Sequence, residues 1–274
     1  MANTSQIPSF PPTFYLLQQE GYLIRSTLTN GLTELRAAHI HNRGSFYAAL
    51  FNLTIGIERL FKVVVVIDYM LDNNMTVLSR KQLKNRGHNI VTLYGECHGI
   101  AQKRSCPLPS LAQLDNIDCE LLSLLSDFAT TNRYYNLDSL GARSTSSDPL
   151  ARLDQLLERI ICQDVSLRKK RRILHDARLS SSLIDPVTLT VITNLDKSPL
   201  STFQALSLPA LHEQAVRYCI LRLIKLLAPI KKLIEILSHG VYRLGPVPAL
   251  PQMHEFLDWL WDNRKYVLGK KKWR

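Results

Sequence analysis

Two residues, His88 and Arg133, are the first candidates for chemistry on a phosphate group. His88 stands at the expected start of a helix, directly after Gly87. An imidazole that titrates near neutral pH can transfer protons as a general acid or base, and a guanidinium can stabilise charge that develops on a phosphate. In the alternative interpretation, a ring nitrogen of His88 caps the end of the helix.

Arg133 begins a polar string that continues through Tyr134, Tyr135 and Asn136. The guanidinium fork of arginine can hold a phosphate with two hydrogen bonds, and tyrosine rings can stack on bases. We therefore predict that Arg133, Tyr134 and Asn136 contribute to nucleic-acid binding. In the alternative interpretation, Arg133 pairs with a carboxylate and the tyrosines cover the edge of the core.

A second basic segment lies further along the chain, where five positive charges occupy two helical turns. Its residues are Arg168, Lys169, Lys170, Arg171 and Arg172. Such a run releases counterions when it neutralises phosphates, which drives nucleic-acid binding; alternatively, it is a solvated helix end that complements the C-terminal macrodipole. The formal charge of +11 favours polyanionic partners, RNA among them, without specifying one.

The sequence contains no pattern typical of a metal site, a cofactor site or a nucleophilic hydrolase. Cys-x-x-Cys, Gly-x-Ser-x-Gly and His-Glu-x-x-His are all absent, so no metal and no cofactor are predicted. Five cysteines at irregular spacings favour a reducing cytoplasm over a disulfide framework. The most apolar stretch, Leu60–Leu71, is far shorter than the roughly 20 residues of a membrane span, so no membrane insertion is predicted.

Helices must position these residues, because apolar residues recur three or four positions apart along most of the chain. The best-defined helix is expected over Phe46–Leu71, with Ser45 as its N-cap. A helix with a break near Gly31 is expected before it, over Thr13–His41. The pattern then predicts helices over Leu78–Arg86, from His88 toward Pro107, and after a cap at Asp118.

The segment Ser139–Pro149 is rich in Ser, Gly and Thr and is the expected boundary between two helical parts. Pro149 suits the first turn of a helix that continues into the basic run. Val187–Thr193 has the composition of a strand but no partner, so we expect a loop or a short hairpin there. Two more helices are expected over His212–Ser238 and Gln252–Leu268, before a basic tail.

The predicted fold class is all-α, an antiparallel helical bundle over residues 13–140 extended by a helical region over 150–274 that packs on it. Residues 141–149 are the expected linker. Residues 1–12 contain three prolines but neither a basic residue nor the apolar segment of a signal peptide. They are therefore expected to be a disordered lead-in.

Three strings, taken together and in order, resemble landmarks of the HEPN family (higher eukaryotes and prokaryotes nucleotide-binding). Ser45–Lys62 contains GIERLFK, similar to a Gly-x-Glu-Arg string followed by a second basic residue in the long helix of the family. Gly87–Ile90 (GHNI) is similar to a turn that opens the next helix, and Arg133–Asn136 (RYYN) to a string that closes the bundle. The resemblance covers about residues 14–140.

The resemblance implies a four- or five-helix bundle that forms a homodimer, and active members of the family cut RNA without a metal. Their signature is an Arg followed, after four to six residues, by a His on the last bundle helix. Here the string at Arg133 lacks such a His, and the spacing occurs only in Arg36 with His41 and Arg168 with His175.

Two hypotheses follow from the residues and the resemblance. In the first, the protein is a metal-independent endoribonuclease or RNA-targeting toxin, of the kind found in toxin–antitoxin or phage-defence systems, with His88 and Arg133 as its catalytic residues. In the second, it is a non-catalytic HEPN-like module that binds nucleic acid or a cognate protein partner.

Overall fold

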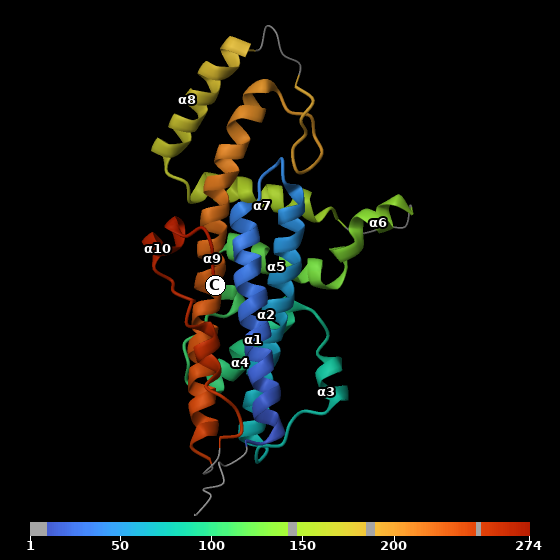
Figure 1. The fold of residues 1–274 in the computed structure, drawn as a ribbon, viewed down its shortest axis with the longest axis vertical. Coiled ribbons are helices and arrows are strands. Elements are labelled where there is room, and N and C mark those ends of the chain that lie inside the picture. Colours follow the sequence, from blue (N-terminus) through green and yellow to red (C-terminus); the bar gives the residue numbers. More distant parts are fainter. Residues whose placement is uncertain (1–9, 142–146, 185–189, 245–247) are drawn as a thin grey trace, which may run out of the picture.

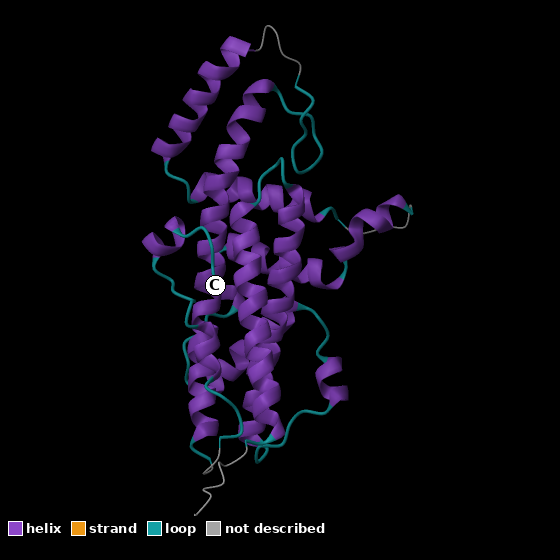
Figure 2. Cartoon of the chain, viewed as in Figure 1, coloured by secondary structure: helices purple, strands orange, loops and turns teal. Residues whose placement is uncertain are grey.

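The computed structural model describes residues 10–141, 147–184, 190–244 and 248–274. Within these ranges the chain forms helices joined by loops, and Figure 2 draws no strand. This confirms the predicted all-α class, whereas the HEPN-type arrangement stays a prediction. None of the described helices combines the length and apolar character that crossing a bilayer requires.

The centre of the fold is a hairpin of two long helices, α1 (Pro12–Ala37) and α2 (Arg43–Asp72). They run side by side along the long axis of the molecule (Figure 1). α2 stays helical through Val63–Val66, although β-branched residues favour extended structure, because all four side chains are buried in the core.

Glycines allow α1 and α2 to approach closely. A Cβ atom added at Gly31 would lie 2.8 Å from Leu53 Cγ and 3.0 Å from the Leu53 backbone nitrogen. One added at Gly56 would lie 2.7 Å from Leu28 Cγ. The expected break near Gly31 is therefore wrong: α1 continues through this residue, which is needed for packing.

Two predicted helix caps are also wrong by a few residues. α2 begins at Arg43 with Asn42 in the N-cap position, and the Asn42 side-chain amide donates to the Ser45 hydroxyl at 2.8 Å. α5 (Asn116–Thr130) is capped by Asp115, whose carboxylate accepts from the Asp118 backbone N–H at 2.8 Å. Both errors arise because several neighbouring residues have side chains able to cap.

Shorter helices surround this hairpin. α3 (Arg80–Asn85) stands apart on a loop, and α4 (Ile90–Lys103) and α5 pack against α2. After a short 3-10 turn, α6 (Tyr135–Leu140) projects away from the bundle (Figure 1). Residues 1–9 of the expected lead-in and 142–146 of the expected linker lie outside the described residues.

The C-terminal region packs on the hairpin through α7 (Pro149–Gln163) and α9 (Thr202–Tyr242). Pro149 occupies the first turn of α7, as predicted. α9 is 41 residues long, so its length is about 60 Å. α8 (Leu167–Ile184) lies beside its first turns, and both extend past the end of the α1–α2 hairpin (Figure 1).

Two expectations for this region need correction or restriction. The helix expected over Gln252–Leu268 is wrong: a 3-10 helix at Met253–Leu257 and the short α10 (Arg264–Gly269) take its place. Of Val187–Thr193, residues 187–189 lie outside the described part. Thr193 makes an isolated bridge with Pro199, which fits the expected loop.

Apolar side chains from both parts of the sequence share one core, which extends from Leu17 to Trp273. Arg222 of α9 joins the surrounding helices electrostatically. Its guanidinium donates to Asp164 at the end of α7 at 2.7 Å, and to Asp115 and Asp118 at the start of α5 at 2.7 and 2.8 Å. Only 10% of the Arg222 side chain is exposed, so this cluster is an internal clamp.

Candidate nucleic-acid interface

The predicted basic run lies on α8, which is attached to the rest of the molecule along one stripe. Ala177 and Ser181 are buried against α9, and Ile173 is half-buried on the same side. These residues recur every four positions, so they form one face of the helix. The remaining positions of α8 are mostly exposed.

The five predicted cations are presented to solvent by this arrangement. Four of them are exposed and Lys170 is half-buried. Lys169 Nζ donates to the Gln214 side chain at 3.2 Å, and Lys170 Nζ donates to the Cys162 carbonyl at 3.1 Å. Neither contact neutralises the lysine charge, because both acceptors are uncharged.

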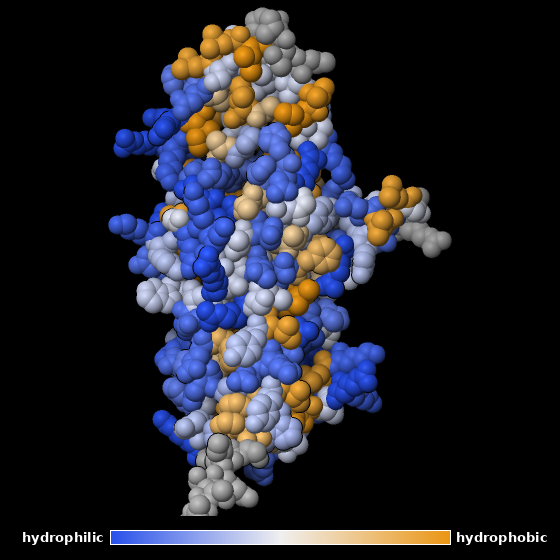
Figure 3. Space-filling model, viewed as in Figure 1, coloured by the Kyte–Doolittle hydropathy of each residue, from blue (hydrophilic) through white to orange (hydrophobic). Residues whose placement is uncertain are grey.

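The charge of α8 is almost uncompensated within the described part of the chain. Asp176 is the one acidic residue of the helix, and its carboxylate lies 3.8 Å from Arg172 Nε. No described carboxylate lies within ion-pair distance of Arg168, Arg171 or Arg178. In Figure 3 the strongly hydrophilic side chains of the first turns of α8 project from the left edge of the molecule.

Two residues outside the predicted run belong to the same surface. His175 and Arg178 follow Arg168 and Arg171 at helical spacing and share their exposed face, opposite the stripe at Ala177. The run of adjacent charges was visible in the sequence, but these two required the helical phase of α8. The helix ends with Leu183 and Ile184, and Leu183 is 80% exposed.

His88 lies elsewhere, on the loop between α3 and α4. Its side chain is 67% exposed, and Nδ1 lies 3.0 Å from Glu58 Oε1 of α2. The same carboxylate oxygen accepts from Lys62 Nζ at 2.7 Å. The interpretation of His88 as a helix cap is wrong, because the Asn89 side chain accepts from the backbone N–H of Thr92 and caps α4.

Arg133 packs on an aromatic ring. Its guanidinium carbon lies 5.7 Å from the centroid of Phe51 in α2, a distance at which a cation is attracted to the ring. No described carboxylate pairs with it, and its buried Nε has no acceptor among the described residues. Tyr134 is 62% exposed, and the Asn136 side chain donates to the Tyr47 hydroxyl at 2.9 Å.

The described contacts do not join the predicted site residues into one cluster. His88 and Arg133 contact α2 at Glu58 and Phe51, which are two turns or about 10 Å apart along the helix axis. Tyr134 and Asn136 belong to the arm that carries α6, which lies on the other side of the molecule from α8 (Figure 1). The basic run is therefore a separate surface.

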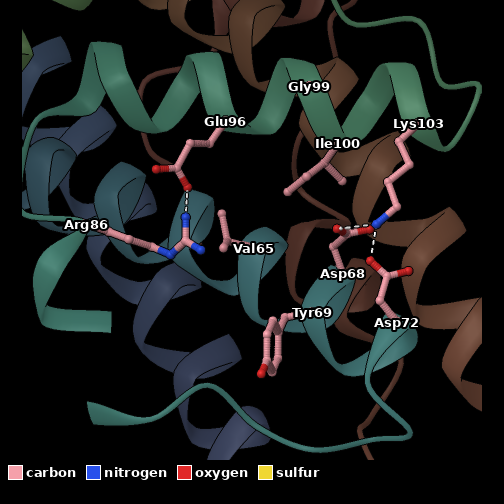
Figure 4. Close-up of a pocket in the computed structure, with 9 residues that line it drawn as sticks. All are labelled: Val65, Asp68, Tyr69, Asp72, Arg86, Glu96, Gly99, Ile100 and Lys103. Atoms are coloured by element: carbon pink, nitrogen blue, oxygen red, sulfur yellow. Dashed lines mark hydrogen bonds and ion pairs between the residues drawn. The ribbon is translucent and has the colours of Figure 1, made fainter. Parts of the chain in front are cut away.

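A pocket of about 320 Å³ lies between α2, α4 and the loop after α3 (Figure 4). Its charged groups satisfy one another: Arg86 pairs with Glu96, and Lys103 pairs with both Asp68 and Asp72. The hydrogen bond from Lys103 raises the acidity of Asp72, whose pKa lies below its ordinary value. The pocket thus offers no charge that needs a ligand.

The described side chains include no group of three His, Cys, Asp or Glu residues that could hold a metal ion. Comparisons of the chain with family models, curated proteins and solved structures gave no match. The HEPN resemblance consequently depends on its three strings alone and stays a prediction.

Proposed function

We propose that the protein binds RNA through the exposed face of α8, as a non-catalytic module that recognises the phosphate backbone. One observation carries the proposal: Arg168, Arg171 and Arg178 share a solvent-exposed helix face and have no carboxylate partner in the described structure. Cations held together on a rigid helix repel one another, and this repulsion is relieved when phosphates lie between them.

The same face argues against readout of base sequence. α8, whose residues are LRKKRRILHDARLSSSLI, contains no Phe, Tyr or Trp to stack on bases, and His175 is its one aromatic ring. Its long cationic side chains can reach phosphates of a flexible strand without entering a groove. We therefore expect single-stranded RNA to bind with strong salt dependence and little sequence preference.

The test is a salt titration of binding to a labelled single-stranded RNA with a 5′-hydroxyl end. In the triple variant Arg168→Gln, Arg171→Gln, Arg178→Gln, three phosphate contacts are lost. Each contact contributes about 0.7 to the slope of log K against log salt for single strands. The magnitude of this slope should therefore decrease by about 2. The association constant for the RNA at about 0.1 M salt should decrease about a hundredfold.

A matched control is available on α3, where Arg80, Lys81 and Lys84 are also exposed. The variant Arg80→Gln, Lys81→Gln, Lys84→Gln removes the same total charge. It should change the salt slope and the affinity for RNA much less than the α8 variant does. Equal effects of the two triple variants would show that only net charge matters, and the proposal for α8 would fall. Tighter binding of duplex DNA than of RNA would contradict the choice of RNA.

Cleavage of RNA is a second candidate function. The observation in its favour is that the exposed His88 imidazole is held by the Glu58 carboxylate, an arrangement that supports proton transfer. Incubation with RNA in EDTA should then give products that end in 2′,3′-cyclic phosphate. The substitution His88→Ala should abolish these products, and cleavage that survives it contradicts this assignment.

A further inference from the structure

A cavity of about 630 Å³ lies between the end of α1, the N-terminal half of α9 and the C-terminal tail. Ala38 and Pro209 contribute to its apolar wall. Its charged lining consists of Arg36, Lys271 and Lys272 against one carboxylate, Glu213. The size falls within the roughly 300–1,000 Å³ typical of small-molecule sites, so the cavity can hold an organic group as well as an ion.

Two guanidinium groups meet around that single carboxylate. Arg36 Nη2 lies 3.5 Å from Glu213 Oε1, and Arg217 donates to the same oxygen. The Arg36 side chain is only 7% exposed. The buried Nε groups of both arginines lack an acceptor among the described residues, and a buried donor without an acceptor is costly. One carboxylate is therefore shared between two guanidinium groups.

The lysines are brought to the cavity by an anchored tail. The Trp273 side chain is buried, with 4% exposure, and its backbone N–H donates to the Thr33 hydroxyl at 3.0 Å. Thr33 itself lines the cavity. Lys271 and Lys272 directly precede this anchor and are exposed. The anchor at Trp273 holds the adjacent backbone, so both lysine side chains start from the border of the cavity.

The electrostatics of the site favour an anion of more than one charge. Burial lowers the pKa of Arg36, and the nearby charge of Arg217 lowers it further. The Glu213 carboxylate and the last carbonyl groups of α1 oppose an anion. Three lining cations, with Arg217 behind them, outweigh one carboxylate and the partial negative charge of a helix end.

We propose that this cavity binds a phosphate monoester that carries a small, partly apolar group, such as a nucleotide. The planar fork of arginine matches two phosphate oxygens, the two lysines supply further charge, and the apolar wall accommodates the organic group. This goes beyond the proposed RNA-binding surface, because it uses another set of residues and a terminal phosphate rather than the strand backbone.

The first experiment compares adenosine monophosphate, inorganic phosphate and uncharged adenosine by isothermal titration calorimetry on the full chain. We expect the monophosphate to bind best and adenosine not to bind. The variant Lys271→Gln, Lys272→Gln should weaken binding of the monophosphate about tenfold, whereas Lys81→Gln, Lys84→Gln on α3 should leave it unchanged. Absence of binding at millimolar concentration, or equal effects of the two double variants, overturns the proposal.

Glu213→Gln should strengthen binding of the monophosphate, whereas the lysine variant should weaken it. Loss of the carboxylate frees the charge of both arginines, so the monophosphate should bind several-fold more tightly in this variant. Circular dichroism checks that the variant is folded. Weaker binding by a folded Glu213→Gln protein contradicts the charge argument.

A second pair of ligands identifies the source of the phosphate. A short RNA with a 5′-phosphate should bind more tightly than the same RNA with a 5′-hydroxyl if the cavity takes strand ends. If it takes free nucleotides, the two RNAs should bind equally and the monophosphate should still bind. The α8 triple variant should lose RNA but keep the monophosphate, so failure of either proposal can be recognised separately.

Discussion

Replacement of Gly31 by alanine tests the close approach of α1 and α2. In an exposed helix this substitution ordinarily stabilises a protein by about 1 kcal/mol, because glycine is the more flexible residue in the unfolded chain. At Gly31 the added Cβ would lie 2.8 Å from Leu53 Cγ and 3.0 Å from the Leu53 nitrogen. Carbon atoms pack best at about 3.5–4.0 Å, so the two helices must move apart.

The expected loss can be worked out from these contacts. Leu53 is 1% exposed, so its side chain has no open space to enter, and its backbone nitrogen belongs to α2. Overpacking of a core costs about 1–3 kcal/mol. After subtraction of the gain of about 1 kcal/mol in helix propensity, Gly31→Ala should destabilise the fold by up to about 2 kcal/mol, which lowers Tm by up to about 4 °C.

Gly95 provides the matched control, because it is an exposed glycine in α4 with no atom within 4 Å of an added Cβ. Gly95→Ala should therefore raise the free energy of unfolding by about 0.5–1 kcal/mol. Urea denaturation followed by circular dichroism measures both variants. If Gly31→Ala stabilises the protein as Gly95→Ala does, the deduced closeness of the two long helices is refuted.

Three further predictions concern the clamp, an acidic residue and the thiols. Arg222→Ala leaves three carboxylates without their shared cation and should lower the free energy of unfolding, measured by urea denaturation, by about 3 kcal/mol. Arg222→Lys should lower it less. A smaller decrease for Arg222→Ala than for Gly31→Ala contradicts the role of Arg222 as a clamp. The pKa of Asp72 is lowered, so its contribution is present above pH 4 and disappears on acidification. The difference in urea midpoint between wild type and Asp72→Asn should consequently narrow as the pH falls below about 4, and a difference that stays constant contradicts this. The exposed Cys162 should react first with iodoacetamide, while Cys219, whose pKa burial raises to about 12, should react only on unfolding; mass spectrometry of the labelled peptides shows the order.

The helical elements could be predicted because their signal is local. Apolar residues at helical spacing located α2, and Pro149 marked the start of α7. The same local logic failed at Gly31, since glycine occurs both where a helix ends and where a neighbouring helix must come close. Only the position of Leu53 on another helix separates the two cases.

The last part of the chain was mispredicted for a different reason. The apolar residues of Gln252–Leu268 suit a helix, but their side chains are buried without one: Leu257 and Leu260 lie in the core on either side of irregular backbone. Asn263 then caps α10 by accepting from the Tyr266 backbone N–H at 3.0 Å. Burial can satisfy a periodic pattern in more than one backbone conformation.

The two candidate sites also differ in how far the sequence predicted them. The charge of α8 was apparent from five adjacent residues, but its lack of partners depends on which carboxylates lie nearby in space. The cavity was not predicted at all, because Arg36, Glu213 and Lys271 come from three separate segments. Each is an ordinary charged residue in its own sequence context.

The distribution of ion pairs explains where the net charge of +11 is available for binding. In the bundle, carboxylates are held by internal cations: Asp68 and Asp72 accept from Lys103 and Arg104, and three aspartates surround Arg222. These groups neutralise one another and contribute little field outside the fold. Exposed cations without a described carboxylate partner remain on α8, on the tail that borders the cavity and on α3, and our proposals assign anion binding to the first two. If this is correct, removal of charge from these two segments should weaken binding of anions far more than removal of the same charge from α3.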